Sequence, residues 1–95
     1  MKEPAVYIMT NKRGGILYTG VTSALGPRVH QHREGFIPGF TARYCCKMLV
    51  WFEFYDTMEA AIAREKQMKA GPRRRKIALI EAMNPNWRDL FDDLF

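Results

Sequence analysis

Five side chains along this sequence could together hydrolyse a phosphodiester bond. In chain order they are Tyr7, Tyr18, Arg28, His32 and Glu65. Tyrosine hydroxyls can handle a water or a leaving group, and an arginine can bind the phosphate. A histidine can carry a proton, and a carboxylate can bind a divalent metal. No one of these residues is diagnostic, but the ordered set predicts a nuclease.

The two tyrosines fall in segments with the alternation of β-strands. Residues 5–10 and 16–21 alternate small and large side chains, and the loop 11–15 between them contains two glycines. This pattern predicts a β-hairpin.

Alternation along the two strands also predicts which way the tyrosines point. If the register allows it, Tyr7 and Tyr18 reach one surface of the sheet. Gly20 removes a side chain next to Tyr18, which opens room for a backbone or a ligand. Their expected neighbours on the same face are Ala5 and Met9 for Tyr7, and Ile16 and Gly20 for Tyr18.

Arg28 and His32 belong to a predicted helix over 24–33, which Ser23 would cap and which would end at Gly35. Residues four apart lie one turn apart on the same face, so the two side chains should be neighbours. By itself such a pair is more typical of a solvated helix face.

The middle of the chain contains a predicted loop and a third strand. Residues 35–46 carry two glycines, Pro38 and three aromatic residues, which predicts a long ordered loop. Residues 47–56 form an apolar run suited to the middle or buried side of a small sheet. The side chains expected on one face of this strand are Met48, Val50, Phe52 and Phe54.

Glu65 lies near the edge of the apolar stripe of a predicted helix that Thr57 caps and that extends to Ala70. Gly71 and Pro72 separate it from another helix over 73–83. The side chains expected to face inward are Met58, Ala61, Ile62 and Met68 on the first helix, and Ile77, Leu79 and Ile80 on the second. The order ββαβαα predicts one α+β domain over 1–95, with a three-stranded antiparallel sheet flanked by helices.

The charge of the chain favours a polyanionic partner. Its net charge is +5 and its pI is near 9.5, and lysine and arginine neutralise phosphates. A run of four cations beside the positive end of a helix dipole is poorly placed for stability alone, so it suggests contact with a nucleic acid, although a solvated helix start is an equal alternative. The candidate nucleic-acid contacts are Lys12, Arg13, Arg73, Arg74, Arg75 and Lys76.

Several other classes of protein are disfavoured. No apolar run approaches the roughly 20 residues of a membrane span, and the start of the chain leads directly into strand-like sequence without a signal peptide. We therefore expect a cytoplasmic protein. Cys45 and Cys46 are adjacent, which strains a disulfide between them, and they lack the spacing of a zinc site. Both are expected to be free thiols.

The ordered set of residues resembles the GIY-YIG nucleases, and the resemblance covers nearly the whole chain. Val6-Tyr7-Ile8 and Tyr18-Thr19-Gly20 stand for the two triplets, with Asn11 between them. Arg28 and His32 are similar to the arginine and histidine of the family's first helix, and Glu65 to its metal-binding glutamate. The ending 84–90 resembles the small stand-alone branch of the family.

The resemblance implies a metal-dependent endonuclease that acts on DNA. Glu65 would hold one Mg²⁺ or Mn²⁺, and Arg28 would bind the scissile phosphate. Tyr7 is the candidate general base, Tyr18 would position the nucleophile or phosphate, and His32 could take the proton onward. Val6 replaces the glycine of the first triplet and Thr19 the isoleucine of the second, both at packing positions. Either Asn84 or Asn86, or neither, would match the family's late asparagine.

Two alternatives use the same residues differently. A non-catalytic nucleic-acid binding module could stack bases on Tyr7, Tyr18 and Phe52, although it would not need Glu65. A nuclease-like subunit could instead present its aromatic tail to a partner protein, unless that tail completes the domain's own core. The tail residues are Trp87, Leu90, Phe91, Leu94 and Phe95. No sequence-reading module is evident, so any specificity should come from DNA structure rather than base sequence.

Overall fold

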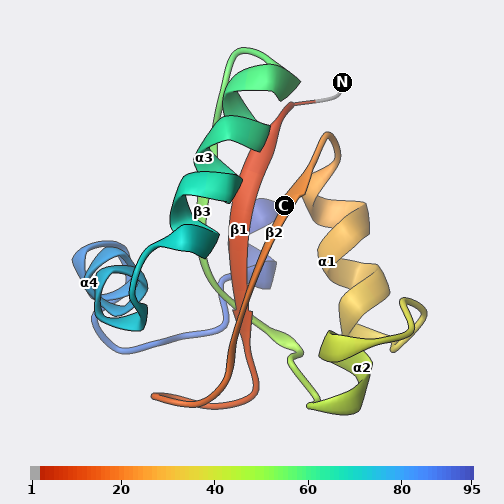
Figure 1. The fold of residues 1–95 in the computed structure, drawn as a ribbon. Coiled ribbons are helices and arrows are strands. Elements are labelled where there is room, and N and C mark those ends of the chain that lie inside the picture. Colours follow the sequence, from red (N-terminus) through yellow and green to blue (C-terminus); the bar gives the residue numbers. More distant parts are fainter. Residues whose placement is uncertain (1–2) are drawn as a thin grey trace.

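The fold is α+β, a three-stranded antiparallel sheet between two layers of helices (Figure 1). The structure is a computed structural model that describes residues 3–95. The sequence predicts no signal peptide at the start of the chain, and the first two residues of that start lie outside the described residues. No helix within 3–95 is long and apolar enough to cross a membrane. The elements are β1 (Ala5–Thr10), β2 (Leu17–Thr22), α1 (Leu25–Arg33), α2 (Phe40–Arg43), β3 (Met48–Phe54), α3 (Met58–Ala70), α4 (Arg73–Met83) and a short 3₁₀ helix, η1 (Phe91–Leu94).

β1, not β3, is the middle strand of the sheet. The strand order is β2-β1-β3, and all six residues of β1 are buried. The apolar run of β3 therefore lies at an edge, but the C-terminal tail covers this edge. The Leu90 N–H donates to the Leu49 carbonyl at 2.7 Å, and the Leu49 N–H donates to Asp89 Oδ1 at 3.2 Å. The tail thus satisfies backbone groups that an edge strand would otherwise expose.

A β-bulge makes the predicted apolar face of β3 wrong. Ile8 pairs with Trp51 and Met9 pairs with Leu49, so Val50 is an extra residue on β3. An extra residue shifts every later side chain to the opposite face. Met48 and Val50 therefore pack on one side of the sheet, whereas Phe52 packs on the other.

Each face of the sheet carries its own hydrophobic cluster. Tyr7 lies in the cluster under α1, with Ala5 and Met9 as predicted, and Ile16 and Tyr18 pack against it. The opposite cluster lies under α3 and α4 (Figure 1). Its buried members are Val6, Ile8, Val50, Trp51, Ala61, Met68, Ile80 and Trp87.

The helices follow the predicted ranges except at the start of α1. α1 begins one residue late, and Ser23 does not cap it; the residue at the cap is Ala24, whose N–H donates to Thr22 Oγ1 at 3.0 Å. Thr57 does cap α3, accepting from the Ala60 N–H at 3.1 Å. Ile62, expected to face inward, is exposed, because the buried side of α3 is set by Ala61 and Met68.

The predicted loop 35–46 contains the one-turn helix α2. Gly39 precedes it with a φ of 111°, a conformation that favours glycine. The Cys46 N–H donates to the Thr41 carbonyl at 2.9 Å, which closes the segment. Both cysteines are free thiols, as predicted; Cys45 is exposed and Cys46 is buried.

The C-terminal tail completes the core of this domain. Trp87 is buried in the cluster under α4, and Leu90 is buried in the cluster under α1. Asn84 fixes the turn between them, since its amide donates to the Arg88 carbonyl at 2.7 Å and its side-chain oxygen accepts from the Arg88 N–H at 3.0 Å. Of the five aromatic and apolar tail residues, only Phe95 is largely exposed, at 83%. The packing thus favours the core alternative over a partner anchor.

Candidate active site

A buried hydrogen-bonded chain joins the first strand to two helices. The Tyr7 hydroxyl lies 2.8 Å from His32 Nε2, and His32 Nδ1 lies 2.9 Å from Thr41 Oγ1. The three side chains are nearly inaccessible, at 2%, 2% and 3% exposed. A neutral imidazole has one donor and one acceptor nitrogen, so each of the two contacts can be a proper hydrogen bond. The chain therefore holds the histidine ring in one orientation.

Burial keeps both titratable members of this chain uncharged. Desolvation, followed by the neighbouring Tyr18 phenol, raises the pKa of Tyr7 well above its usual value, although the charge of Arg28 acts in the opposite direction. Desolvation and then the Arg28 charge lower the pKa of His32. At neutral pH, His32 is a neutral imidazole and Tyr7 is a protonated phenol.

The lowered pKa of His32 predicts how stability depends on pH. The unfolded chain takes up this proton near pH 6.5, whereas the folded chain resists it. The contribution to stability is therefore complete above about pH 6.5 and is lost as the pH falls toward the lower folded-state pKa. Thermal melts between pH 7.5 and 5 should show this decline. His32→Gln, which keeps hydrogen-bonding groups but does not titrate, should flatten it; an equally steep decline in the variant would contradict the assignment.

Gly20 allows the two tyrosines to meet. It pairs with Tyr7 across β1 and β2, and a Cβ at this position would lie 2.4 Å from Tyr7 Cζ and 2.5 Å from its hydroxyl oxygen. The space that the sequence suggested for a ligand is thus filled by the Tyr7 ring. Tyr18 lies beside it, with ring centroids 6.3 Å from Tyr7 and 5.4 Å from His32.

Tyr18 is more accessible to solvent than Tyr7. It is partly exposed, and it lines a hollow of about 240 Å³ together with Phe40, Lys69 and Lys76. Lys76, together with Lys69, which is also paired with Glu65, supplies positive charge at the wall of this hollow. Tyr18 therefore lies between the buried Tyr7–His32 chain and a basic surface.

Arg28 and Glu65 come to the same region from opposite layers. Arg28, on α1, is close enough for its charge to lower the pKa values of both Tyr7 and His32. The charge of Glu65, on α3, raises the pKa of Tyr7. The five predicted catalytic residues are thus close enough to interact, although they come from three different parts of the fold.

Glu65 is more buried than a typical surface carboxylate. Its side chain is only 14% exposed, and its Oε2 lies 3.0 Å from Lys69 Nζ. Within residues 3–95, no three acidic, histidine or cysteine side chains converge as a ready-made metal cage. Mg²⁺ often keeps several waters and binds through one or two carboxylates plus substrate phosphates. A single carboxylate such as Glu65 is compatible with that kind of binding.

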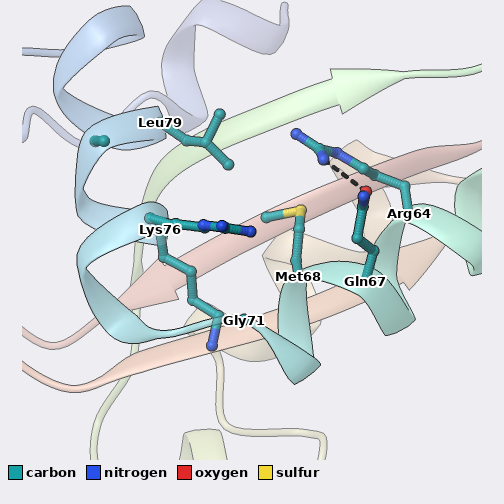
Figure 2. A pocket seen from close by; sticks show the side chains of 8 residues that line it. Arg64, Gln67, Met68, Gly71, Lys76 and Leu79 are labelled. Atoms are coloured by element: carbon teal, nitrogen blue, oxygen red, sulfur yellow. Dashed lines mark hydrogen bonds between the residues drawn. The ribbon is translucent and has the colours of Figure 1, made fainter.

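The predicted basic run separates into residues with different roles. Arg73 donates to the carbonyls of Gly14 and Gly15 at 2.9 Å and 2.6 Å, so it ties α4 to the hairpin loop. Arg75 and Lys76 line a groove of about 310 Å³ between α3 and α4, where Met68 lies beneath Leu79 and next to the hydrogen-bonded pair Arg64 and Gln67 (Figure 2).

The remaining predicted contacts are exposed and lie near this surface. Arg74 is exposed on α4, and Lys12 and Arg13 are exposed on the hairpin loop, where Lys12 and Arg73 line a shared hollow. The hairpin loop and the start of α4 therefore form one basic area.

Three residues near the site had no role in the sequence prediction. Thr41 anchors His32, but nothing in a loop sequence reports such a contact. Lys69 follows Glu65 by one helical turn, and that spacing could have identified it as a partner. Phe40 stacks on Tyr18 with ring centroids 6.0 Å apart, a contact that depends on the unpredicted α2.

Burial argues against the base-stacking face suggested for a binding module. Tyr7 is 2% exposed, and Phe52 packs against the cluster under α1. The Tyr7 ring therefore offers no free face to a base, and the Phe52 ring is partly covered. Val6 and Thr19, which depart from the family triplets, are buried as packing positions should be. Asn84 is used in the tail turn, and Asn86 is exposed on it.

Comparisons with known proteins agree on one family. The model of the GIY-YIG catalytic domain matches residues 3–78. A UPF0213 protein of Haloquadratum walsbyi is 38% identical over 65 residues, which cover 68% of this chain and 73% of that protein. A UPF0213 protein of Staphylococcus aureus is 34% identical over 81 residues, covering 85% and 98%. The solution structure of a UPF0213 protein from Bacillus halodurans covers 92% of both chains, at 25% identity and a TM-score of 0.57.

Proposed function

This chain belongs to the GIY-YIG family, and from that premise we propose that it is a metal-dependent endonuclease that hydrolyses phosphodiester bonds in DNA. Family membership implies nuclease chemistry on a nucleic acid. The proposal adds the divalent metal, DNA as the substrate and selection by DNA structure instead of base sequence. It also takes residues 1–95 as one nuclease domain that works in the cytoplasm.

One observation carries the proposal: a phenol–imidazole–hydroxyl chain lies beside one arginine and one carboxylate. A domain that only needed a stable core would gain little from burying Tyr7, His32 and Thr41 as a polar chain, because such groups cost free energy unless all are satisfied. Catalysis gives this arrangement a use. It fixes a neutral imidazole that can accept a proton, within range of a cation suited to a phosphate.

Arg28 and Glu65 handle the charges of the reaction in this proposal. The guanidinium of Arg28 binds the scissile phosphate and stabilises the additional negative charge of the transition state. Glu65 would hold Mg²⁺ or Mn²⁺, which when bound supplies charge neutralisation at a phosphate oxygen and at the leaving group. Lys69 neutralises the Glu65 carboxylate in the free protein and is well placed to turn toward a phosphate when the metal replaces it.

Burial changes the roles that the sequence suggested for the two tyrosines. Tyr7 has no access to a water and a raised pKa, so it is a poor direct base. Tyr18 is partly exposed and is the better partner for the attacking water. We assign a relay in which Tyr18 takes the water proton and passes its own proton to the Tyr7 oxygen. Tyr7 then passes its own proton to His32 Nε2, while Thr41 accepts from Nδ1 and so fixes the tautomer.

Matched tyrosine substitutions test the proposed chemistry. Tyr18→Phe and Tyr7→Phe each remove one oxygen and keep the ring, and each should lower the single-turnover cleavage rate by about 10²-fold or more. Affinity for DNA should stay within a few-fold of wild type. Tyr7→Phe leaves His32 Nε2 without its partner and should cost about 1–3 kcal/mol of stability, so circular dichroism must first show a folded protein. Normal cutting by folded Tyr18→Phe would exclude the relay.

We call Tyr7, Tyr18, Arg28, His32 and Glu65 the catalytic cluster of this proposal. Basic side chains outside the catalytic cluster should contribute affinity for DNA without sequence preference. Replacing Arg74 and Arg75 by alanine should weaken DNA binding for every sequence and lower the slope of log affinity against log salt by about one for each phosphate that is no longer neutralised. Arg88→Ala is a suitable control, since Arg88 is exposed but paired with Asp93 at 2.9 Å. If the double variant kept the wild-type slope, these arginines would not be in the interface.

A further inference from the structure

Two exposed aromatic side chains lie against each other at α2, next to Tyr18. We call Phe40 and Tyr44 the aromatic platform; they are 44% and 38% exposed. Large rings in water need an explanation when they gather in one place. We propose that the aromatic platform binds unpaired bases of the DNA strand that is cut. This inference rests on the proposed function and specifies its substrate as DNA with a single-stranded stretch.

The fold holds these rings outward. Thr41 points into the core, where it meets His32, and this contact fixes the orientation of the single turn of α2. Phe40 and Tyr44 are one turn apart, joined by a hydrogen bond from the Tyr44 N–H to the Phe40 carbonyl at 3.0 Å. Their ring centroids are 4.8 Å apart. The contact that positions the catalytic imidazole therefore also positions the aromatic platform.

Phe40 makes the aromatic platform continuous with the catalytic cluster. One of its sides stacks on Tyr18, at an interplanar angle of 30°, and lines the hollow that contains Lys69 and Lys76. It also lines a broad, open hollow of about 800 Å³ with Tyr44. A strand whose phosphate lay beside Tyr18 would thus have its neighbouring bases over α2.

The charges around the aromatic platform favour a nucleic acid over other apolar partners. Among the described residues, no carboxylate lines either hollow, whereas Lys69 and Lys76 line one and Arg43 lines the other. The Arg43 guanidinium carbon lies 5.4 Å from the centre of the Tyr44 ring, an arrangement that also suits stacking against a base. Aromatic rings interleaved with cations are the usual surface for single-stranded nucleic acid. Bases in a perfect duplex are already stacked and could not use it.

The test measures binding in a chelator, so that no DNA is cut. Fluorescence anisotropy compares a single-stranded oligonucleotide, the same sequence as a duplex, and an abasic strand with the same number of phosphates. Tyr44→Leu should weaken single-strand binding by about tenfold and duplex binding by less than about twofold. Phe95→Leu is the matched control, because Phe95 is also exposed and lies in the C-terminal tail.

The abasic strand needs no variant and gives an independent answer. Wild type should bind it about tenfold or more weakly than the intact strand. Equal affinity for the two strands, or equal losses in Tyr44→Leu and Phe95→Leu, would overturn the aromatic platform. If wild type binds the intact strand more tightly than the abasic strand but cuts no DNA, the platform stands and the nuclease proposal fails. If it cuts DNA but binds both strands equally, the nuclease proposal stands and the platform fails.

Discussion

Replacing Glu65 by glutamine is expected to abolish cleavage while DNA binding persists. Glutamine keeps the size and hydrogen-bonding reach of glutamate but not the charge that a divalent cation requires. The side chain is only 14% exposed and is the proposed metal ligand, so we expect that another carboxylate cannot easily take its place. We expect the single-turnover rate to fall by at least about 10³-fold, which corresponds to several kcal/mol of transition-state stabilisation. Binding should be unchanged or tighter, because a negative charge near the phosphate is removed.

The control for this variant is Glu59→Gln on the same helix. Glu59 is exposed in the first turn of α3, where its negative charge interacts favourably with the positive end of the helix dipole. It should cut DNA at the wild-type rate. Wild-type cleavage by Glu65→Gln in Mg²⁺ would refute the metal assignment, and equal losses in both variants would indicate that the two carboxylates act together.

Gly20→Ala should cause the largest loss of stability of any single methyl added in the sheet. The new Cβ would lie 2.4 Å from Tyr7 Cζ, so the Tyr7 ring would have to move and its bond to His32 would break. Overpacking and a buried unpaired group together should cost about 2–5 kcal/mol. For a domain of this size, the melting temperature should fall by about 10 °C or more. Cleavage should also fall in the fraction that remains folded, because the relay is broken.

A second glycine on α1 provides the matched control. A Cβ at Gly26 would lie 3.4 Å from the nearest atom, Phe95 Cζ, which belongs to an exposed side chain. Alanine is also the better helix former, so Gly26→Ala should be neutral or should stabilise by up to about 1 kcal/mol. If Gly20→Ala melted within a few degrees of Gly26→Ala, Gly20 would not be the residue that admits the Tyr7 ring.

Much of the fold could be predicted because its signals are local. The hairpin, the Thr57 cap and the Gly71-Pro72 break between α3 and α4 each depend on a few neighbouring residues. The face of β3 could not be predicted, since the bulge at Val50 depends on pairing with β1. The position of β3 at an edge was missed for a similar reason. Its apolar character is explained by the tail, which follows about 40 residues later and covers it.

In the candidate site, residue types could be predicted from the sequence, but the burial of each residue could not. Residue order indicated Tyr7, Tyr18 and Glu65 as candidates, but not how deeply each would be buried. Burial is what moves the direct contact with water from Tyr7 to Tyr18 in our proposal. Thr41 and the aromatic platform were missed because a single turn of helix inside a loop leaves almost no periodic signal.

The central claim is tested most directly by incubating the purified wild-type chain with end-labelled DNA in Mg²⁺, Mn²⁺ or chelator. The substrates should include single strands, a perfect duplex, a flap and a branched junction, all built from one set of sequences. We predict cutting that requires the metal, is abolished in chelator and occurs at or next to unpaired nucleotides, with little dependence on base sequence. An absence of cutting on every substrate, by protein shown to be folded and to bind DNA, would contradict the account and would favour a binding module.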